Sequence, residues 1–182
     1  MTQFWKTFAG AAALIGLTMG GVPLALQAPA QAQTSASTAG SATAEVDPVT
    51  FFTGTTVSNG TIKEAFSSQK TTRATSVGTL QSDGSLVITQ TVEIGDDPVR
   101  KRTWRLRELA GGKVTGSISD ATSPVKGQIN GNAMTLTYKL EGGLKVNQVL
   151  TMNPDGKTCK NEMKIRKFGI VVARLSEVIS RK

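Results

Sequence analysis

Residues 85–108, SLVITQTVEIGDDPVRKRTWRLRE, contain the pattern that decides the fold. Every second residue from Leu86 to Ile94 is apolar except Gln90, which is the period of a β-strand with one buried face. The Asp-Asp-Pro sequence at 96–98 then favours a tight reversal of the chain. The stretch therefore predicts two antiparallel strands joined by a short turn.

The second half of this stretch, residues 100–108, places five cationic side chains around Trp104. Successive side chains of a strand point to opposite faces, so Trp104 and Leu106 identify the buried face. Arg102 shares that face and is predicted to point inward. The outward-pointing set is then Lys101, Thr103, Arg105 and Arg107.

The same alternation recurs farther along the chain. Residues 134–140 and 146–152 each have apolar or amphipathic side chains at every second position, and turn residues separate the runs. A sheet of such strands has two exposed edges unless it closes on itself. We therefore expect an all-β fold, a single antiparallel up-and-down barrel of about 8–10 strands that is lipocalin-like, rather than a two-sheet sandwich. Strands should cover about half or more of residues 50–182, with at most one short helix.

The N-terminal residues follow a different pattern. Residues 1–32 contain the cation Lys6, an apolar run over 7–26 and two Ala-x-Ala sequences, which is the order of a secretory signal peptide. A retained membrane anchor is the alternative, because the apolar run is nearly long enough to cross a bilayer. Residues 33–48 are small and polar and are predicted to be a flexible linker. The barrel domain is expected over residues 49–182.

The signal peptide predicts an exported protein that is periplasmic or associated with the cell envelope. The composition adds that the 182 residues include no histidine, which removes Ser-His-Asp and Cys-His couples and the commonest metal ligand. The single cysteine, Cys159, is expected to point inward, and it lies far from the lipobox position of a lipoprotein. The sequence therefore predicts no catalytic residues, no metal site and no cofactor.

The formal net charge of +8 is expected to lie mainly outside the barrel. A nucleic-acid site would need exposed aromatic residues among the cations, and Trp104 is expected to face inward, so we predict no nucleic-acid partner. The cations are instead expected to form a basic exterior suited to peripheral contact with an anionic membrane surface. This basic exterior comprises Lys101, Arg105, Arg107, Lys160, Lys164 and Arg166.

Arg102 is the inward-pointing residue that most needs a partner. A cation directed into a barrel is costly unless an anion or an aromatic ring meets it. Three partners remain open: a carboxylate of Glu108 or Glu177, the ring of Trp104, or the carboxylate or phosphate of a bound amphiphile. The predicted ligand-binding set comprises Arg102, Trp104, Tyr138, Met134, Gln148 and Met152.

Several short motifs accompany these residues: FFTGTTVSNGTI (51–62), RTW (102–104), Gly116, the tyrosine of MTLTYKL (134–140) and MKIRKFG (163–169). Together they resemble the bacterial envelope proteins of domain of unknown function 3833. The resemblance extends from residue 51 to the C terminus and implies an exported protein, often a lipoprotein, without implying an activity. It also implies a glutamate in the strand before R-x-W, where Gln90 stands in this sequence.

Two functions follow as expectations. The first is non-catalytic binding of an apolar or amphiphilic ligand, such as a lipid or fatty acid, inside the barrel. The second is a filled structural barrel that associates with anionic envelope surfaces through its basic exterior. Enzyme activity is not expected, because no general base with an orienting partner is recognisable.

Overall fold

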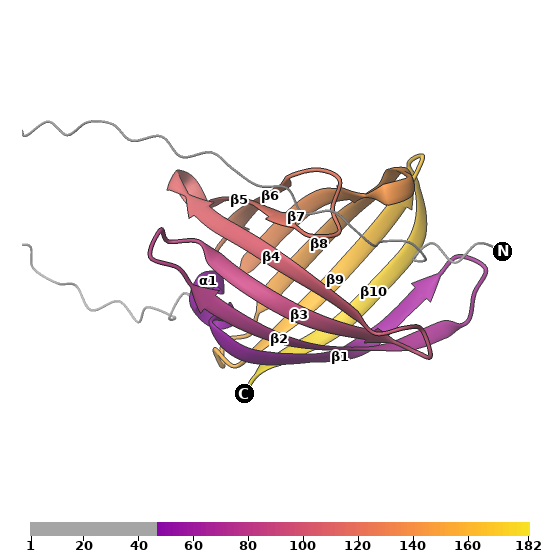
Figure 1. Cartoon of the computed structure of the whole chain (residues 1–182), viewed down its shortest axis with the longest axis horizontal. Coiled ribbons are helices and arrows are strands. Elements are labelled where there is room, and N and C mark those ends of the chain that lie inside the picture. The colour runs from indigo at the N-terminus through magenta and orange to yellow at the C-terminus, as the bar shows by residue number, and fades with distance from the viewer. Residues whose placement is uncertain (1–46) are drawn as a thin grey trace, which may run out of the picture. The chain divides into compact units, whose positions relative to one another are not determined.

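Each strand of the structure pairs with the next one along the chain, because the turn residues between them favour short hairpins. The computed structural model describes residues 47–182, and within them ten antiparallel strands form a closed barrel (Figure 1). The elements in chain order are α1 (Pro48–Phe52), β1 (Gly54–Glu64), β2 (Gln69–Leu80), β3 (Leu86–Ile94), β4 (Arg100–Leu109), η1 (Ala110–Gly112), β5 (Lys113–Ile118), β6 (Val125–Asn130), β7 (Ala133–Leu140), η2 (Glu141–Gly143), β8 (Leu144–Met152), β9 (Thr158–Lys167) and β10 (Ile170–Arg181).

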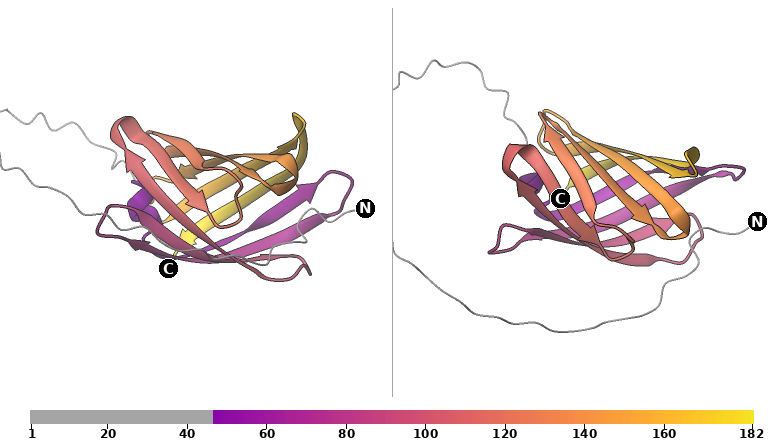
Figure 2. Two further views of the ribbon diagram at one scale, coloured as in Figure 1. Left: turned by 45° about the horizontal axis from the view of Figure 1, so that its top comes forward. Right: turned by 90° about the horizontal axis from the view of Figure 1, so that it is seen from above.

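The barrel closes where its first strand meets its last. β1 runs antiparallel to β10, from Thr56 opposite Arg181 to Glu64 opposite Ala173, so neither strand leaves a free edge. Figure 2 shows from two further directions that the strands wrap around one common interior. The expected all-β, up-and-down, lipocalin-like barrel is confirmed. The sandwich alternative is wrong, because one continuous ladder joins all ten strands.

The short helix α1 precedes the barrel, and its first residues explain why it forms. The carboxylate of Asp47 accepts hydrogen bonds from the backbone N–H groups of Val49 and Thr50, both at 3.0 Å. Pro48 occupies the first turn, where its fixed φ suits a helix and its missing N–H is not needed. Asp-Pro is thus the local signal that starts the helix.

The boundaries predicted for the N-terminal part need one correction. The predicted linker, residues 33–48, overlaps the helix and its cap at Asp47 and Pro48, so the ordered domain begins before residue 49. The predicted signal peptide, residues 1–32, lies outside the residues that the structure describes, as do residues 33–46. Within the described part of the chain, no helix is both long enough and apolar enough to cross a bilayer.

α1 covers one end of the barrel, which we call the helix end (Figure 1). Phe51 is fully buried there and Phe52 is nearly so. Gly78 of β2 gives the helix room, since a β-carbon on Gly78 would lie 1.8 Å from the carbonyl oxygen of Phe52. Nη1 of Arg181 donates a hydrogen bond to the carbonyl oxygen of Thr50 at 3.1 Å. Packed side chains and these hydrogen bonds therefore hold α1 against the end of the barrel.

The opposite end is called the Phe66 end, after its most exposed large hydrophobic residue. Because consecutive strands alternate in direction, every second turn lies at this end. These turns are residues 65–68, 95–99, 119–124, 141–143 and 168–169. The two ends differ in what covers them, since α1 lies only at the helix end.

The inward face of the barrel is mostly apolar, with buried apolar side chains on every strand. Polar side chains share this face on eight of the ten strands. They are Thr56 and Ser58 (β1), Thr72 and Ser76 (β2), Gln90 (β3), Arg102 (β4), Tyr138 (β7), Gln148 (β8), Asn161 (β9) and Glu177 (β10). Most of these polar groups are hydrogen-bonded to one another, as buried polar groups usually are.

Candidate functional site

Strand β4 has the predicted register. Trp104 and Leu106 are buried in the barrel, and the side chain of Arg102, which is 17% exposed, lies on the same face. The neighbouring Lys101 is exposed, as are the other members of the outward-pointing set. The alternation of the sequence therefore identified both faces of this strand correctly.

Arg102 lies in a network of polar and aromatic side chains that come from neighbouring strands. Its Nε donates a hydrogen bond to Oε1 of Gln90 on β3 at 2.7 Å, and Nε1 of Trp104 donates to the same oxygen at 3.3 Å. Nε2 of Gln90 donates to Oγ of Ser76 on β2 at 3.0 Å. The guanidinium carbon lies 5.3 Å from the centre of the Trp104 ring, within the range of a cation–π contact. One of the expected partners, Trp104, is therefore present.

The carboxylate nearest to Arg102 is that of Asp120, not Glu108 or Glu177. Nη1 of Arg102 lies 3.8 Å from Oδ2 of Asp120, which is longer than a charge-assisted hydrogen bond. The β4–β5 register explains the position, because Trp104 lies opposite Ile118, the last residue of β5. Arg102 precedes Trp104 by two residues and Asp120 follows Ile118 by two, so the chain leaves β5 with Asp120 beside Arg102. Within residues 47–182, Oδ1 of Asp120 is buried and has no hydrogen-bond partner.

Tyr138 completes this group, the Arg102 cluster, which comprises Ser76, Gln90, Arg102, Trp104, Asp120 and Tyr138. Its ring meets the ring of Trp104 edge to face, with centroids 5.7 Å apart and planes at 86°. Burial raises the pKa of Tyr138 to about 12, because the phenolate would lose its hydration inside the barrel. The phenol is therefore neutral at physiological pH, and it can donate or accept a hydrogen bond.

A second polar group lies on the wall formed by β8, β9 and β10. Nε2 of Gln148 donates to Oδ1 of Asn161 at 3.0 Å, and Nδ2 of Asn161 donates to Oε2 of Glu177 at 3.1 Å. Glu177 lies opposite Gly60 of β1, where a β-carbon would come within 2.7 Å of its Cγ. Gly60 therefore leaves the room that the buried Glu177 side chain occupies.

Three inward-facing polar atoms near this second group have no hydrogen-bond partner within residues 47–182. They are Oγ of Ser58, Oγ1 of Thr72 and Oε1 of Gln148, and all three residues are at least nine-tenths buried. Thr72 lies opposite Gly60, next to Glu177 across the β1 strand. Buried polar atoms are nearly always hydrogen-bonded in native proteins, so these atoms mark places that a water or a ligand group would satisfy.

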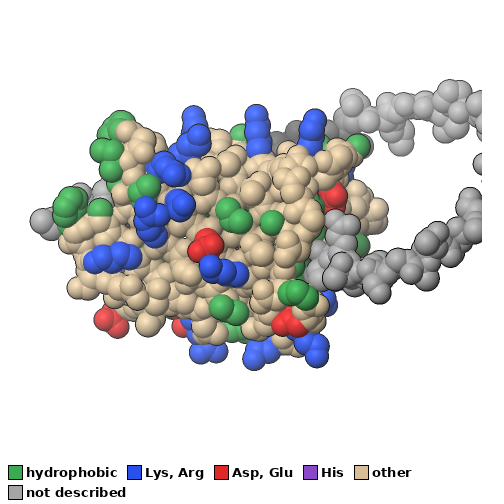
Figure 3. Space-filling model, turned by 180° about the vertical axis from the view of Figure 1, so that it is seen from behind, with side chains coloured by type: hydrophobic (Ala, Val, Ile, Leu, Met, Phe, Trp, Pro, Cys, Tyr) green, Lys and Arg blue, Asp and Glu red, His purple; other side chains and the backbone are tan. Residues whose placement is uncertain are grey.

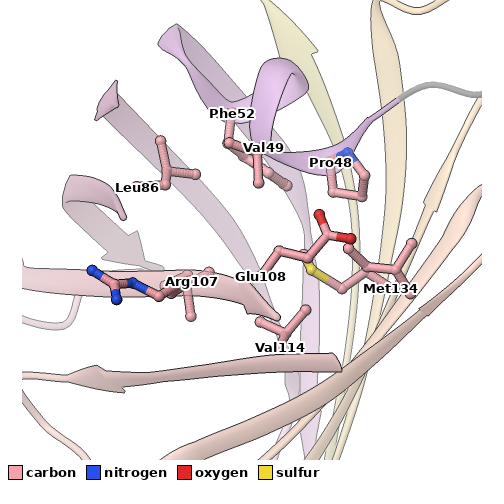
Figure 4. A pocket seen from close by; sticks show the side chains of 10 residues that line it. Pro48, Val49, Phe52, Leu86, Arg107, Glu108, Val114 and Met134 are labelled. Carbon is pink, nitrogen blue, oxygen red and sulfur yellow. The ribbon is translucent and has the colours of Figure 1, made fainter. Parts of the chain in front are cut away.

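The six predicted ligand-binding residues all point inward, but they do not form one site. Arg102, Trp104 and Tyr138 come together, and Gln148 belongs to the second polar group. Met134 instead lines a small pocket under α1, with Pro48, Phe52 and Val114 among its neighbours (Figure 4).

The pocket under α1 is too small for a lipid. Its void volume is about 10 Å³, which is room for about one water molecule. Met152, the last residue of β8, is fully buried near the same helix end. The two methionines are therefore part of the apolar packing at the helix end, away from the Arg102 cluster.

The predicted basic exterior does not form a single patch. Lys101, Arg105 and Arg107 lie on β4, whereas Lys160, Lys164 and Arg166 lie on β9, and five strand steps separate β4 from β9 in either direction around the barrel. The two groups therefore lie on opposite sides of the molecule.

Several of these cations also have local partners. Arg107 is 2.8 Å from the carboxylate of Asp83 and Arg105 is 3.6 Å from it. Hydrogen bonds from Ser85, assisted by the two arginines, lower the pKa of Asp83 to about 2. On β9, Lys160 forms an ion pair with Glu162 at 3.1 Å. These contacts are those of an ordinary charged surface.

Cys159 points inward and is fully buried, as predicted from its parity. Burial raises the pKa of its thiol to about 12, so the thiolate is not formed at neutral pH. Within residues 47–182 no three cysteine or carboxylate side chains come close enough together to hold a metal ion.

The chain belongs to the family described as "Protein of unknown function (DUF3833)", whose model matches residues 25–181. The resemblance found in the sequence motifs is thereby confirmed. No curated protein matches the sequence.

Several solved structures share the fold. The S-type phycobiliprotein lyase CPES from Guillardia theta matches with a TM-score of 0.59 and 8% identity, over 74% of this chain and 90% of that one. Rv2717c from M. tuberculosis matches with a TM-score of 0.54 and 16% identity, over 75% and 99%. A protein of unknown function from the DUF3598 family of Nostoc punctiforme matches with a TM-score of 0.55 and 12% identity, over 74% of this chain and 48% of that one, so the chain spans about half its length. The likeness is one of fold.

Proposed function

We propose that the protein is an exported, non-catalytic carrier that binds an amphiphilic, lipid-like ligand inside the barrel. The observation that carries the proposal is the set of buried, inward-facing polar atoms at Ser58, Thr72 and Gln148 that have no partner within residues 47–182. Each such atom costs about 1–3 kcal/mol unless a water or a ligand group meets it. A ligand with a polar part and an apolar part offers both the missing hydrogen bonds and contacts with the apolar wall.

Ten strands support the proposal because the diameter of a barrel grows with strand number. A barrel of about eight strands already holds side chains or one small ligand, and ten strands enclose a wider interior. The resemblance in fold to the phycobiliprotein lyase is compatible with a binding role, although the two sequences share only 8% identity.

Arg102 is the proposed anchor for an anionic head group. Its Nε is held by Gln90, and within residues 47–182 its two Nη atoms donate no hydrogen bond. Asp120 balances the charge at 3.8 Å without a close hydrogen bond, so the Nη groups keep their capacity to bind a carboxylate or phosphate. Gln90 and Trp104 hold the guanidinium in place, which reduces the entropy lost when a ligand binds.

The same inward groups suit binding better than catalysis. The chain contains no histidine, and the buried Glu177 carboxylate is engaged by Asn161. Burial keeps the Cys159 thiol protonated at neutral pH by raising its pKa to about 12. The proposed location in the periplasm or cell envelope rests on the signal-peptide pattern of residues 1–32.

Native mass spectrometry of the protein purified from its own host tests the proposal first. We expect a reproducible lipid-sized adduct, and a clean apoprotein in repeated preparations would contradict a carrier role. Oleate and its neutral alcohol then test the anchor. Arg102→Ala should weaken oleate binding by about 10–150-fold, the scale of a lost charge-assisted hydrogen bond, and should leave binding of the alcohol nearly unchanged.

Lys101→Ala is the matched control, because Lys101 neighbours Arg102 but points outward. It should leave both affinities and the folding stability nearly unchanged. If Arg102→Ala weakens the acid and the alcohol equally, Arg102 acts through the packing of Trp104 and is not a head-group anchor.

A further inference from the structure

The Phe66 end carries three large hydrophobic side chains that are almost entirely exposed. Phe66 is 98% exposed, Phe168 is 91% exposed and Ile170 is 71% exposed. Phe66 lies in the turn between β1 and β2, and the other two lie at the turn between β9 and β10. Single exposed hydrophobic residues are common, but three at one end of a barrel are typical of a surface that binds a partner.

The two turns are neighbours because β1 and β10 form the seam of the barrel. The backbone N–H of Ala65 donates a hydrogen bond to the carbonyl oxygen of Val172 at 2.8 Å, which joins the two hairpins at their tips. Both phenylalanines also have a left-handed backbone, with φ of 62° at Phe66 and 50° at Phe168. This conformation is costly for a bulky residue. At Phe168 and Gly169 it belongs to the two-residue hairpin between Lys167 and Ile170, which requires a positive φ at both positions.

Cationic side chains form a belt on the outer wall next to these tips. The cation belt comprises Lys63 (β1), Lys139 (β7), Lys145 (β8), Lys164 and Arg166 (β9) and Arg174 (β10). All six lie on the outward face, within a few residues of the turns at the Phe66 end. Figure 3 shows, at its left, hydrophobic side chains protruding from one end of the barrel with Lys and Arg side chains on the wall beside them.

The belt places like charges directly opposite each other on neighbouring strands. Arg174 lies opposite Lys63 on one side and Lys164 on the other, and Lys145 lies between Lys139 and Arg166 in the same way. Like charges in such positions destabilise a sheet. Within residues 47–182 no ion pair joins any member of the belt to a carboxylate. The local partners are neutral: Lys63 donates a hydrogen bond to the carbonyl oxygen of Ser67, and Arg166 donates one to Oδ1 of Asn147.

The charge at the Phe66 end is asymmetric. The belt occupies β7 to β10 and β1, and the carboxylates of this half near the turns are Glu64 at the end of β1 and Glu141 in η2. The turns on the other half carry Asp96, Asp97 and Asp120, but the cations Lys70, Arg100, Lys101 and Arg102 lie next to them, so that half is closer to neutral. The exposed phenylalanines belong to the basic half. Exposed apolar tips surrounded by cations are the pattern of a protein that binds at the interface of an anionic membrane.

We propose that the basic half of the Phe66 end docks onto an anionic lipid bilayer, with Phe66, Phe168 and Ile170 in the interface and the cation belt facing the head groups. The proposal does not depend on ligand binding inside the barrel. It would nevertheless bring the interior close to lipid, because Arg102 is the third residue of β4 and β4 begins at this end. Docking would also explain the cost of exposing two strained phenylalanines.

Co-sedimentation with vesicles tests the proposal, using the chain from Gln33 onward so that the apolar run of residues 7–26 does not contribute. This chain retains every strand of the closed barrel. We expect binding to vesicles of phosphatidylcholine mixed with phosphatidylglycerol. The double variant Phe66→Ser with Phe168→Ser should weaken the binding by at least about tenfold. Removing apolar surface at the helix end, Leu80→Ser with Leu109→Ser, should change it by less than about twofold.

The contribution of the cation belt to vesicle binding is tested with a second double variant, Lys63→Gln with Arg174→Gln. This pair should weaken binding to the mixed vesicles by about tenfold or more, and raised salt should remove the difference from the unaltered chain. Lys113→Gln with Lys157→Gln, near the helix end, is the matched control and should have little effect.

Three results would overturn the docking proposal: no binding of the unaltered chain, equal losses in the control variants, or Phe66- and Phe168-dependent dimers without vesicle binding. The last result would assign the tips to a second copy of the chain. Circular dichroism and urea unfolding of each variant show that the fold is retained. Oleate binding by the phenylalanine variants should be unchanged, so failure of docking and failure of ligand binding are distinguishable.

Discussion

The two ends of the barrel place the same residue type in opposite environments. At the helix end, Phe51 is fully buried, beside Phe52 at a centroid distance of 4.9 Å. At the Phe66 end, Phe66 and Phe168 extend into solvent from turns with left-handed backbone. Hydrophobicity alone therefore does not assign a role, because a phenylalanine stabilises the fold only where it is removed from water.

The comparison also separates stability from interaction. At the helix end, apolar side chains and Gly78 fit α1 against the strands, as expected of packing that stabilises a fold. At the Phe66 end, exposed aromatic residues, left-handed backbone and opposed like charges each reduce stability. Features that reduce stability and occur together are more easily explained by an interaction than by the fold.

The largest effect expected is from truncating one phenylalanine at each end. Phe51→Ala should lower the free energy of unfolding by about 3–5 kcal/mol, since it removes a fully buried ring and leaves a cavity. Phe66→Ala should change it by no more than about 0.5 kcal/mol, because that ring contacts mainly water. Urea unfolding followed by the intrinsic fluorescence of Trp104 measures both. Equal losses would remove the distinction between the two ends.

A smaller effect concerns how well the interior excludes water toward the Phe66 end. Tyr138 is the sole tyrosine of the chain, so the ultraviolet absorbance of its phenolate reports this residue alone. The pKa should be about 12, against about 10 in the unfolded chain. Because the folded pKa is the higher one, stability is fully present below about pH 10. It should fall by about 2–3 kcal/mol as the pH rises to about 12.

The pH titration has a clear contrary outcome. A phenolate that appears near pH 10 while circular dichroism still shows the folded barrel would mean that water reaches Tyr138. The buried thiol of Cys159, whose pKa is also raised to about 12, should lower stability in the same alkaline direction. The absorbance of the phenolate separates the tyrosine from the cysteine, and the unfolding data report their sum.

The smallest effect concerns the backbone at the Phe66 end. Phe168→Gly should raise the free energy of unfolding by up to about 1 kcal/mol, because glycine adopts a φ of 50° without the clash of a β-carbon. Phe168→Ala removes the same ring but keeps the β-carbon, so it should not be stabilising. Urea unfolding of both variants compares them. If alanine stabilises as much as glycine, the backbone at Phe168 is not strained.

Much of the fold could be predicted because its signals are local. Alternation from Leu86 to Ile94 and around Trp104 identified the inward faces, and frequent turn residues indicated a meander that had to close. The start of α1 was missed although Asp47-Pro48 is a recognisable cap followed by a first-turn proline.

The candidate site was predictable only in part, because its contacts combine several strands. The inward direction of Arg102 followed from parity. The resemblance implied a glutamate where Gln90 stands, but the hydrogen bond between Gln90 and Arg102 was not predicted. Asp120 lies in the turn after β5, and its place beside Arg102 depends on the β4–β5 register. A β-hairpin centred on Gly111 pairs residues that are equally far from Gly111 in the sequence. Such a hairpin, inferred from the turn residues Gly111 and Gly112, would have placed residue 120 opposite residue 102.

The second polar group and the cation belt were not predicted, since they depend on pairings that no local pattern specifies. Glu177 and Gly60 meet only because the last strand joins the first. The same is true of Lys63 and Arg174, which are far apart in the sequence and directly opposed in the barrel.

The seam between β1 and β10 also determines when the barrel can close during synthesis. β1 pairs with the last of the ten barrel strands to be made, from Thr56 opposite Arg181 onward. Until Arg181 has been made, both edges of the growing sheet present unpaired backbone N–H and C=O groups. Closure also joins residues of large sequence separation, which slows folding. The barrel therefore stays open until β10 has been made, and the unpaired edges of the sheet are exposed for that time.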